Sequence, residues 1–423
     1  MKKEVVPKKF SCFLLGYTGC HNTGSDVRIL TIIDDLRECF GDDVSITVAS
    51  FYPENTAKII PTSDQVKIEH VPFIFPRKIF QIVRRHDVTM LVEGSCFKQN
   101  WGSVLLYLFL WGALWAKLSG KRCVAYAIDV GELSPANRFF TRTICNKIDL
   151  LITRTEIARA RLIEMGVKTG IIANTDTAFR FMPGHSTPSP DLPSANTLGI
   201  APVEFHQWPL KTRPFGKKEE CYNYPYYYTW DDERREKSRR LIEAFRELIK
   251  HAIDVHDLDI VLIAMEALDA DICQKIFDGL GPAYQAKTRI VASNDHTPFQ
   301  MAPLLRSLKY LVTSRYHACV ISLNQAVPQM AIAHDERLVS IYTELGIEKE
   351  LLIDYRDPDL TEKMIPTLDH LITRSGDLKA VLKHKLDEYF LPTCAQNKVD
   401  LKSWAEGRAE PLSEQAVPLP ETS

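Results

Sequence analysis

The stretch KYLVTSRYHACVISLNQAVPQMAIA (309–333) decides the fold of this chain. It begins with an apolar run that ends at Val312, passes through a helix-like stretch, and ends in a second apolar run, VPQMAIA. Two buried strands joined by a helix run parallel in one sheet. Ligands bind outside the carboxyl ends of such strands, where a helix N-terminus carries partial positive charge, so Arg315 and His317 fall at a ligand-binding position.

The same alternation of strand-like runs and helical periods continues on both sides of this unit. The earlier runs are FSCFLLGY (10–17), VSITVASF (44–51), VTMLVEG (88–94), RCVAYAI (122–128), IDLLITR (148–154), NTLGIAPVEF (196–205), LDIVLIAM (258–265) and TRIVAS (288–293). Such alternation predicts parallel sheets covered by helices. A chain of 423 residues exceeds one ordinary core. We therefore expect an α/β protein with two Rossmann-like, doubly wound domains that face a cleft.

Composition shifts give the expected boundaries. Residues 182–196 collect Pro, Ser and Gly without an apolar period, which is typical of a linker. We expect domains at 1–181 and 197–358, followed by C-terminal helices at 359–391. From 392 to 423 periodicity is lost and Pro, Ser and Glu increase, so this tail is predicted to be disordered.

Charge and cysteine usage exclude several classes of function. The net charge is −2 and the pI about 6.6, so we expect no nucleic-acid partner. Ten cysteines lack paired spacing, no metal-like Cys/His cluster is seen, and the first residues lack an apolar signal, so we expect a reduced, cytoplasmic protein without a bound metal. The apolar part of 102–120 is about 15 residues, shorter than the roughly 20 of a bilayer span. It predicts a buried helix, and its Trp and Phe leave peripheral contact with the inner face of a membrane open.

A long insertion, QWPLKTRPFGKKEECYNYPYYYTWDDERREKSR (207–239), interrupts the second alternating region. Loops of this length and aromatic content are usually functional or mobile. Two interpretations remain open, a surface excursion and a lid that stacks on sugar rings.

Arg315 and His317 together suit a small dianionic ligand. A guanidinium offers a planar fork for phosphate or carboxylate, and an imidazole can bind an anion or move a proton near neutral pH. The structural alternative is an arginine solvated at the rim of the sheet and a histidine capped by the local backbone.

Glycines mark the first strand-to-helix turn, FLLGYTGCHNTGSDVRIL (13–30). The turn is neither a Walker A motif nor G-x-G-x-x-G, so it does not specify a nucleotide. Asn22 and Asp26 either cap the following helix or contact an acceptor. Two further strand ends, Glu93-Gly94-Ser95 and Arg154, bring the number of strand-end clusters to four.

Taken together, these residues resemble the polysaccharide pyruvyl transferase family from about residue 10 to 355. The stretches that carry the resemblance are GYTGCHNTGSD (16–26), EGS (93–95), IDLLITRTEIARARLIEMGV (148–167), NTDTAFRF (174–181) and SRYHACVISLNQAVPQMAIAHDERLVSIYTELGI (314–347). The resemblance implies a fold like that of the GT-B glycosyltransferases. It also implies transfer of pyruvate from phosphoenolpyruvate to two hydroxyls of a cell-envelope or exopolysaccharide sugar, forming a ketal.

The resemblance also implies roles for individual residues. Arg315 and His317 would be catalytic, with His317 as the acid or the phosphate clamp. The implied donor-binding residues are Arg154, Arg315, Tyr316, His317 and Arg337, and the implied acceptor-side residues are Gly19, His21, Asn22, Gly24, Asp26, Gly94 and Ser95. No cofactor is implied beyond phosphoenolpyruvate as substrate. The partner is a saccharide acceptor, whose linkage to a lipid stays open, as does the oligomeric state.

This chain departs from the family pattern in places. The first turn reads Gly24-Ser25-Asp26 where many members have Gly-Asp-Glu, and Arg337 stands where lysine is common. A GT-B nucleotide-sugar glycosyltransferase and a non-catalytic polysaccharide-binding member therefore stay as alternative functions.

Overall fold

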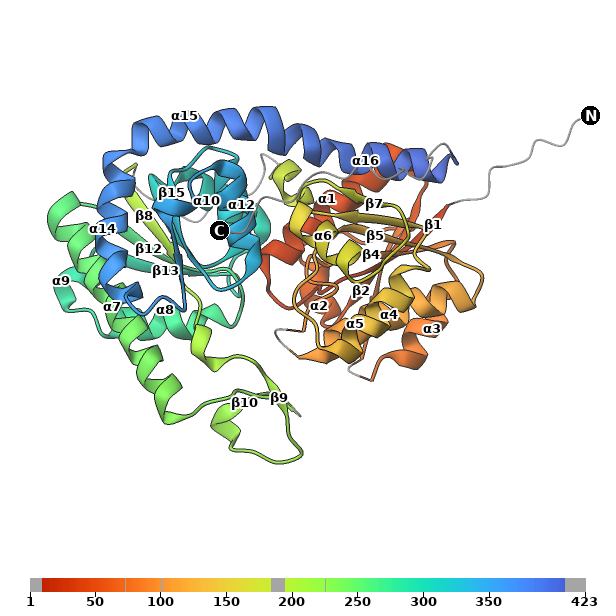
Figure 1. Cartoon of the computed structure of the whole chain (residues 1–423), viewed down its shortest axis with the longest axis horizontal. Helices are drawn as coiled ribbons and strands as arrows, with labels where there is room; N and C mark the ends of the chain where they lie inside the picture. The colour runs from red at the N-terminus through yellow and green to blue at the C-terminus, as the bar shows by residue number, and fades with distance from the viewer. Residues whose placement is uncertain (1–9, 73, 100–101, 184–194, 225, 408–423) are drawn as a thin grey trace, which may run out of the picture.

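The fold is taken from a computed structural model that describes residues 10–72, 74–99, 102–183, 195–224 and 226–407. Two α/β lobes lie side by side, and a long helical run crosses from one to the other (Figure 1). The predicted fold class is confirmed. Most of the expected linker, 182–196, lies outside the described residues.

The first lobe is built on a seven-stranded parallel sheet with the order β3-β2-β1-β4-β5-β6-β7. This is the order of a doubly wound Rossmann-like sheet. Its strands are β1 (Ser11–Leu15), β2 (Ser45–Ser50), β3 (Val66–His70), β4 (Val88–Leu91), β5 (Arg122–Ile128), β6 (Leu150–Thr153) and β7 (Ile171–Ala173). Its helices are α1 (Thr23–Phe40), α2 (Pro53–Ala57), α3 (Pro76–Val83), α4 (Ser103–Leu118), α5 (Pro135–Cys145), α6 (Glu156–Glu164) and the 3-10 turn η1 (Thr177–Arg180).

Each face of this sheet buries its own apolar cluster. Phe13 and Leu15 of β1 pack with residues of α3 to α6, whereas Cys12 and Leu14 pack with residues of α1 on the other face. Alternate residues of one strand therefore fill two cores, as expected for a sheet covered by helices on both sides.

The second lobe repeats the design in a six-stranded parallel sheet, β13-β12-β8-β14-β15-β16. The strands are β8 (Thr197–Ala201), β12 (Asp259–Ala264), β13 (Thr288–Ala292), β14 (Tyr310–Thr313), β15 (Gln329–Ala333) and β16 (Leu352–Asp354). The helices are α7 (Asp232–His256), α8 (Asp269–Asp278), α9 (Pro282–Gln285), α10 (Pro298–Ser307), α11 (Tyr316–Leu323), α12 (Glu336–Leu345), α13 (Glu348–Leu351) and α14 (Leu360–Thr373). The stretch 309–333 forms β14, α11 and β15, and both strands are buried throughout.

The C-terminal helices return the chain to the first lobe. α15 (Ser375–Lys385), a π-helical turn (Leu386–Phe390) and α16 (Leu391–Ala405) form the long run across the top of Figure 1. The fully buried Asn397 donates to the Thr175 carbonyl at 2.9 Å and accepts from the Asn174 side chain at 3.2 Å. The prediction of disorder from residue 392 is thus wrong as far as Ala405, because polar contacts with the first lobe stabilise a helix without a strong apolar pattern. Residues 408–423 lie outside the described part of the chain.

The insertion between β8 and α7 forms a small antiparallel sheet, β10-β11-β9, apart from the main layers (Figure 1). Its strands are β9 (Lys211–Thr212), β10 (Cys221–Asn223) and β11 (Tyr226–Tyr227), flanked by the 3-10 turns η2 (Phe205–Gln207) and η3 (Lys218–Glu220). The hydroxyl of Tyr222 lies 3.3 Å from that of Tyr17 in the first lobe, so the insertion reaches across to the opposite lobe.

Within the described residues, no helix is both long enough and apolar enough to cross a bilayer.

Candidate functional site

A cavity of about 430 Å³ lies between the two lobes and the insertion. The first lobe contributes the glycine turn and Glu93, the second lobe contributes Arg315, His317 and Arg337, and the insertion contributes Tyr222. Three of the four strand-end clusters singled out in the sequence therefore meet at one cavity, the place where doubly wound folds bind ligands.

A fully buried carboxylate, Asp176, ties the site together. Its Oδ1 lies 2.8 Å from Nη1 of Arg28, and its Oδ2 lies 2.5 Å from Nη1 of Arg154. Burial alone would raise the pKa of Asp176, but the two guanidiniums hold it well below its usual value. Asp176 is therefore a fixed negative charge that holds two buried arginines in place.

Arg154 has a supporting position rather than the direct donor contact that the sequence predicted. Its guanidinium also pairs with Asp129 at 3.2 Å and lies 4.5 Å from the centre of the Tyr316 ring. Among the described residues that line the cavity, Arg154 is absent, whereas Tyr316 is present. Arg154 thus acts on the cavity through its neighbours.

His317 links the second lobe to the glycine turn of the first. Its Nε2 lies 3.6 Å from Oδ2 of Asp176, and its ring packs directly on Gly24, where a Cβ atom would lie 1.9 Å from Nδ1. Burial lowers the pKa of His317 and the nearby Asp176 opposes this only in part, so the ring is neutral at pH 7. A neutral imidazole is suited to hydrogen bonding more than to proton donation.

Two glycines predicted to contact an acceptor in fact make room for side chains of the site. A Cβ at Gly94 would lie 2.4 Å from Nη1 of Arg154, as a Cβ at Gly24 would overlap His317. Gly24 also lines the cavity, whereas Gly94 is not among the described lining residues.

Arg315 does not present a free fork. Its Nη1 lies 2.9 Å from Oε2 of Glu266, and its Nη2 is ion-paired with Asp269. Burial would lower the pKa of Arg315, but these two carboxylates raise it. Burial in turn raises the pKa of Asp269 to about 6, although Arg315 opposes the shift. The positive charge of Arg315, which was predicted to bind the donor, is thus largely compensated by Glu266 and Asp269 of the second lobe.

Arg337 forms an ion pair with Asp335 beside a larger ionic cluster. Its Nε lies 2.6 Å from Asp335, and its guanidinium lies 5.9 Å from the centre of the Tyr316 ring. Four cations and three carboxylates join through ion pairs, an excess of one positive charge: Arg28, Lys98, Arg154 and Arg161 with Asp129, Asp176 and Glu336. The Arg337–Asp335 pair lies beside this cluster, and Asp129 adds to the raised pKa of Arg337. Such an excess in a buried setting favours an anionic ligand at the Arg337 side of the cavity.

The lining of the cavity also includes the carboxylates Glu93 and Glu266. Oε2 of Glu93 accepts from the Ser25 hydroxyl at 3.0 Å and from the Tyr17 amide at 3.3 Å. Burial, with a smaller contribution from Glu93, raises the pKa of the neighbouring Asp26 to about 8. Asp26 therefore keeps its proton at neutral pH, although it is not among the described residues that line the cavity.

The remaining predicted residues of the first turn dock the two lobes. Asn22 caps α1 by accepting from the Ser25 amide at 3.1 Å, the capping role proposed for it. The carbonyl of His21 accepts from Ser293 at 2.7 Å, and Gly19 lines the cavity with φ +83°. Ser95 also lines the cavity, and its amide donates to Glu93 at 3.4 Å.

Sequence reasoning missed several parts of the site. Asp129 and Asp176 follow directly after or close behind β5 and β7, so their place at strand ends was a usable signal. Asp335 and Glu336 carry the same signal behind β15, whereas Lys98 offered none because its ion pair with Glu336 of the other lobe brings it in. An apolar wall of the cavity was missed as well: Phe51, Tyr52, Phe75, Val104, Leu105, Leu108 and Phe109.

The chain was compared with protein-family models, curated proteins and solved structures. A family model described as polysaccharide pyruvyl transferase matches residues 22–336. No curated protein matches the chain.

Solved structures with the same two-lobed, GT-B-type architecture have low sequence identity. The structure of S. aureus MnaA with UDP has a TM-score of 0.59 at 10% identity, covering 95% of this chain and 98% of that chain. UDP-GlcNAc 2-epimerase from Methanocaldococcus jannaschii has a TM-score of 0.51 at 15% identity, covering 86% and 92%. A glycosyltransferase from Rickettsia africae has a TM-score of 0.52 at 10% identity, covering 95% and 100%.

Proposed function

Because the chain belongs to the polysaccharide pyruvyl transferase family, we propose that it transfers pyruvate from phosphoenolpyruvate to two hydroxyls of a saccharide, forming a ketal and releasing phosphate. The observation that carries the proposal is the polarity of the interlobe cavity. Its lining includes Arg337, which is paired with Asp335 beside a cluster with excess positive charge, and the carboxylates Glu93 and Glu266, so the cavity offers both cationic and acidic groups.

This polarity suggests where each substrate binds. Phosphoenolpyruvate carries a phosphate and a carboxylate, which suit Arg337 and the N–H group of the neutral His317. Sugar hydroxyls suit Glu93 and Glu266, because carboxylates accept their hydrogen bonds. Arg315 then serves to hold Glu266 in position, a change from the direct donor contact expected from the sequence.

The reaction can be written with its protons accounted for. A proton adds to the methylene carbon, the electron-poor C2 accepts one sugar hydroxyl, and a second hydroxyl displaces phosphate at C2. Of the two hydroxyl protons released, one replaces the proton consumed at the methylene and the other leaves with phosphate. The proposed acid is Asp26, which is protonated at neutral pH and lies behind the lining residues Gly24 and Ser25 without being among the described lining residues itself, while His317 clamps the phosphate. These steps need no cofactor or metal.

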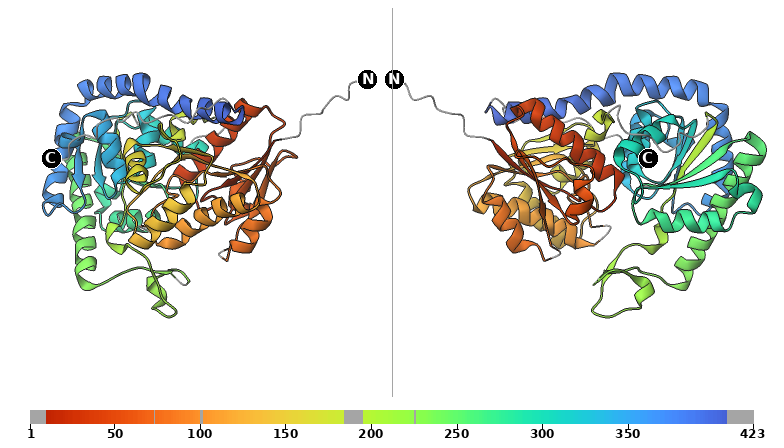
Figure 2. Two further views of the ribbon diagram at one scale, coloured as in Figure 1. Left: turned by 45° about the vertical axis from the view of Figure 1, so that its right-hand side comes forward. Right: turned by 180° about the vertical axis from the view of Figure 1, so that it is seen from behind.

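We propose an amphipathic acceptor, a saccharide linked to a lipid, because one wall of the cavity is apolar and includes Phe75, Leu105 and Phe109. The layer of α3 to α5 lies on the side of the first lobe away from α16 (Figures 1 and 2). Phe139 and Phe140 of α5 are exposed there, and residues 76–147 hold eleven Lys and Arg against four Asp and Glu. Exposed aromatic and basic groups suit an anionic bilayer, which would place the protein in the cytoplasm at the inner face of a membrane.

The test of membrane contact is cosedimentation with phosphatidylglycerol or phosphatidylcholine vesicles. We expect binding to the anionic vesicles, reduced by the double change Phe139→Ser and Phe140→Ser. The control Val381→Ser removes an exposed apolar side chain from α15 and should have no effect. Equal binding of the double variant and the control would contradict this surface.

Pyruvyl transfer is tested by phosphate release and by a pyruvate-sized mass increase of saccharide acceptors. Arg337→Ala should weaken phosphoenolpyruvate binding, seen as a loss of its thermal stabilisation, and His317→Asn should do the same. Asp26→Asn should abolish turnover while donor binding remains. Wild-type transfer rates in all three variants would refute the assignment.

The alternative functions have their own signatures in the same assays. Thermal stabilisation by nucleotide sugars and not by phosphoenolpyruvate would favour a glycosyltransferase. Donor binding without phosphate release for every acceptor would favour a non-catalytic binding protein.

A further inference from the structure

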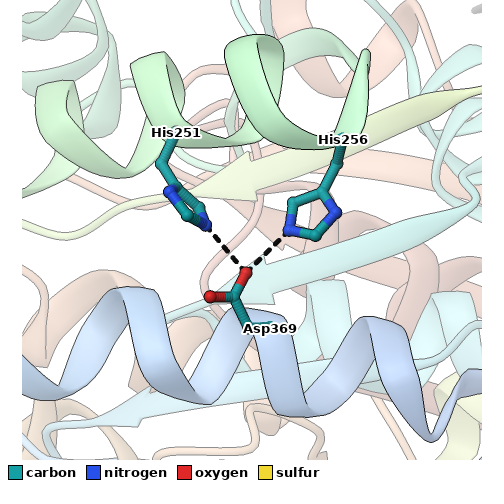
Figure 3. Close-up of side chains that lie close together, drawn as sticks. All are labelled: His251, His256 and Asp369. Carbon is teal, nitrogen blue, oxygen red and sulfur yellow. Dashed lines mark hydrogen bonds and ion pairs between the residues drawn. The ribbon is translucent and has the colours of Figure 1, made fainter.

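A cluster of two histidines and one aspartate lies away from the cavity, between two helices of the second lobe. His251 and His256 come from the last turns of α7, and Asp369 comes from α14 (Figure 3). The three ligand atoms all lie within 4.8 Å of one another. Each side chain is partly exposed, so ions can reach the cluster from solvent.

Both imidazoles aim the same atom at the same oxygen. Nε2 of His251 lies 2.8 Å from Oδ1 of Asp369, and Nε2 of His256 lies 2.7 Å from that oxygen (Figure 3). The rings do not stack on each other, since their planes are 73° apart with centres 5.4 Å apart. The two nitrogens and the carboxylate therefore converge on one small volume from two helices.

The geometry is close to that of a metal site. A tetrahedral Zn²⁺ with bonds of about 2.0 to 2.1 Å places its ligand atoms about 3.3 Å apart. Each nitrogen must thus move away from the oxygen by roughly half an ångström for the ion to enter. Rotation of the partly exposed Asp369 side chain supplies such a movement without displacement of either helix.

The ligand types select the class of metal. Imidazole nitrogen with one carboxylate suits Zn²⁺ and its transition-metal neighbours, whereas Mg²⁺ and Ca²⁺ prefer sites built from oxygen alone. Three protein ligands leave the fourth position to water. We propose that His251, His256 and Asp369 form a binding site for Zn²⁺ or a similar divalent transition metal, which fastens α14 to α7.

The position of the site indicates a structural role. α14 leads through α15 into α16, the helix that packs on the first lobe, so a metal at Asp369 fixes the base of that crossing run. The site is thus independent of the proposed pyruvyl transfer, and we expect metal to change stability rather than turnover.

The test uses the full chain after treatment with a chelator and dialysis. Titration calorimetry with Zn²⁺ should show one saturable site, and Zn²⁺ should raise the melting temperature while Mg²⁺ does not. Co²⁺ should give the visible absorption bands of a tetrahedral N/O site.

Substitutions locate the site. His256→Ala and the nearly isosteric Asp369→Asn should each weaken Zn²⁺ binding by at least about 100-fold, since even the groups that support a ligand are worth 10- to 100-fold. The matched control is His370→Ala, which removes the neighbouring histidine of α14, engaged with Glu350 at 3.1 Å. It should leave binding unchanged.

Absence of saturable Zn²⁺ binding by the wild-type chain would overturn the proposal, and the cluster would then be a hydrogen-bonded link between two helices. Equal affinity in the wild type and Asp369→Asn would overturn it too. If a variant fails to fold, anomalous diffraction at the zinc edge of wild-type crystals decides the question, because the peak must lie between these three side chains.

Discussion

The close contact between Gly24 and His317 predicts that one methyl group added at position 24 would destabilise the protein. In Gly24→Ala the new Cβ would lie 1.9 Å from Nδ1 and 2.3 Å from Cγ of the His317 ring. Ordinary carbon contacts are about 3.5 to 4.0 Å, so the ring or the turn must shift by roughly 1.5 Å or more. The backbone of Gly24 needs no positive φ, so the collision with His317 is the main cost.

Two opposing effects set the size of the change. Overpacking of this kind costs about 1 to 3 kcal/mol, whereas alanine favours a helix over glycine by about 0.5 to 1 kcal/mol. Gly24→Ala should therefore destabilise the wild type by up to about 2.5 kcal/mol. In a His317→Ala background the collision is gone, so the same change should be neutral or stabilising.

Melting temperatures of the four proteins of this double-mutant cycle measure the coupling. About 1 to 3 kcal/mol of coupling corresponds to roughly 2 to 12 °C in a lobe of this size. A Gly24→Ala effect of equal size in both backgrounds would show that the ring does not rest on the glycine, and the description of the lobe contact would be wrong.

Three further changes test other parts of the structure. Asp176→Asn should cost about 3 to 5 kcal/mol in denaturant unfolding, because it removes a charge that faces two buried guanidiniums, while the control Glu247→Gln at an exposed pair should cost less than about 1. Asp26 has a pKa raised to about 8, so the folded state holds a proton that the unfolded state releases near pH 4, and its contribution to stability falls as pH rises from 4 to 8. Asp26→Asn should thus gain melting temperature relative to wild type over that range, and a constant difference would refute the shift. Asn397→Ala should cost about 1 to 3 kcal/mol by leaving the Thr175 carbonyl without a partner and removing one of the two hydrogen bonds of the Asn174 amide, the other going to Asp400, and calorimetry of thermal unfolding can measure this cost.

The central strands of both sheets could be predicted because their residues are buried on both sides. YLVT of β14 and QMAIA of β15 read as continuous apolar runs, and parallel burial is what such runs indicate. Three of the four edge strands could not: VKIEH of β3 is partly exposed, and β7 and β16 have only three residues each.

The sequence predicted where the site lies but not which charged side chains pair with each other there. Strand-end logic brings His317 and the Gly24 turn to one cavity, and the family resemblance adds Arg337, which lines the same cavity. It could not show that Arg315 is neutralised by Glu266 and Asp269, which lie more than forty residues away in sequence. The direct roles proposed for individual residues stay predictions until the variants are measured.

α16 escaped prediction for a different reason. Its buried residues, Cys394, Asn397 and Leu401, have the spacing of a helix face, but an asparagine and a cysteine do not stand out as apolar. A helix that is buried through hydrogen-bonded polar side chains shows no apolar periodicity in its sequence, so the sequence does not predict it.

The crossing of α16 also sets an order of assembly during synthesis. The strands of the first lobe leave the ribosome early, yet the groove that receives Asn397 waits until the chain has been made as far as α16. In a nascent first lobe, the Thr175 carbonyl stays exposed to water while the whole second lobe is translated. An excised N-terminal half would keep that defect permanently, so the lobes are better regarded as one interlocked folding unit than as two separable modules.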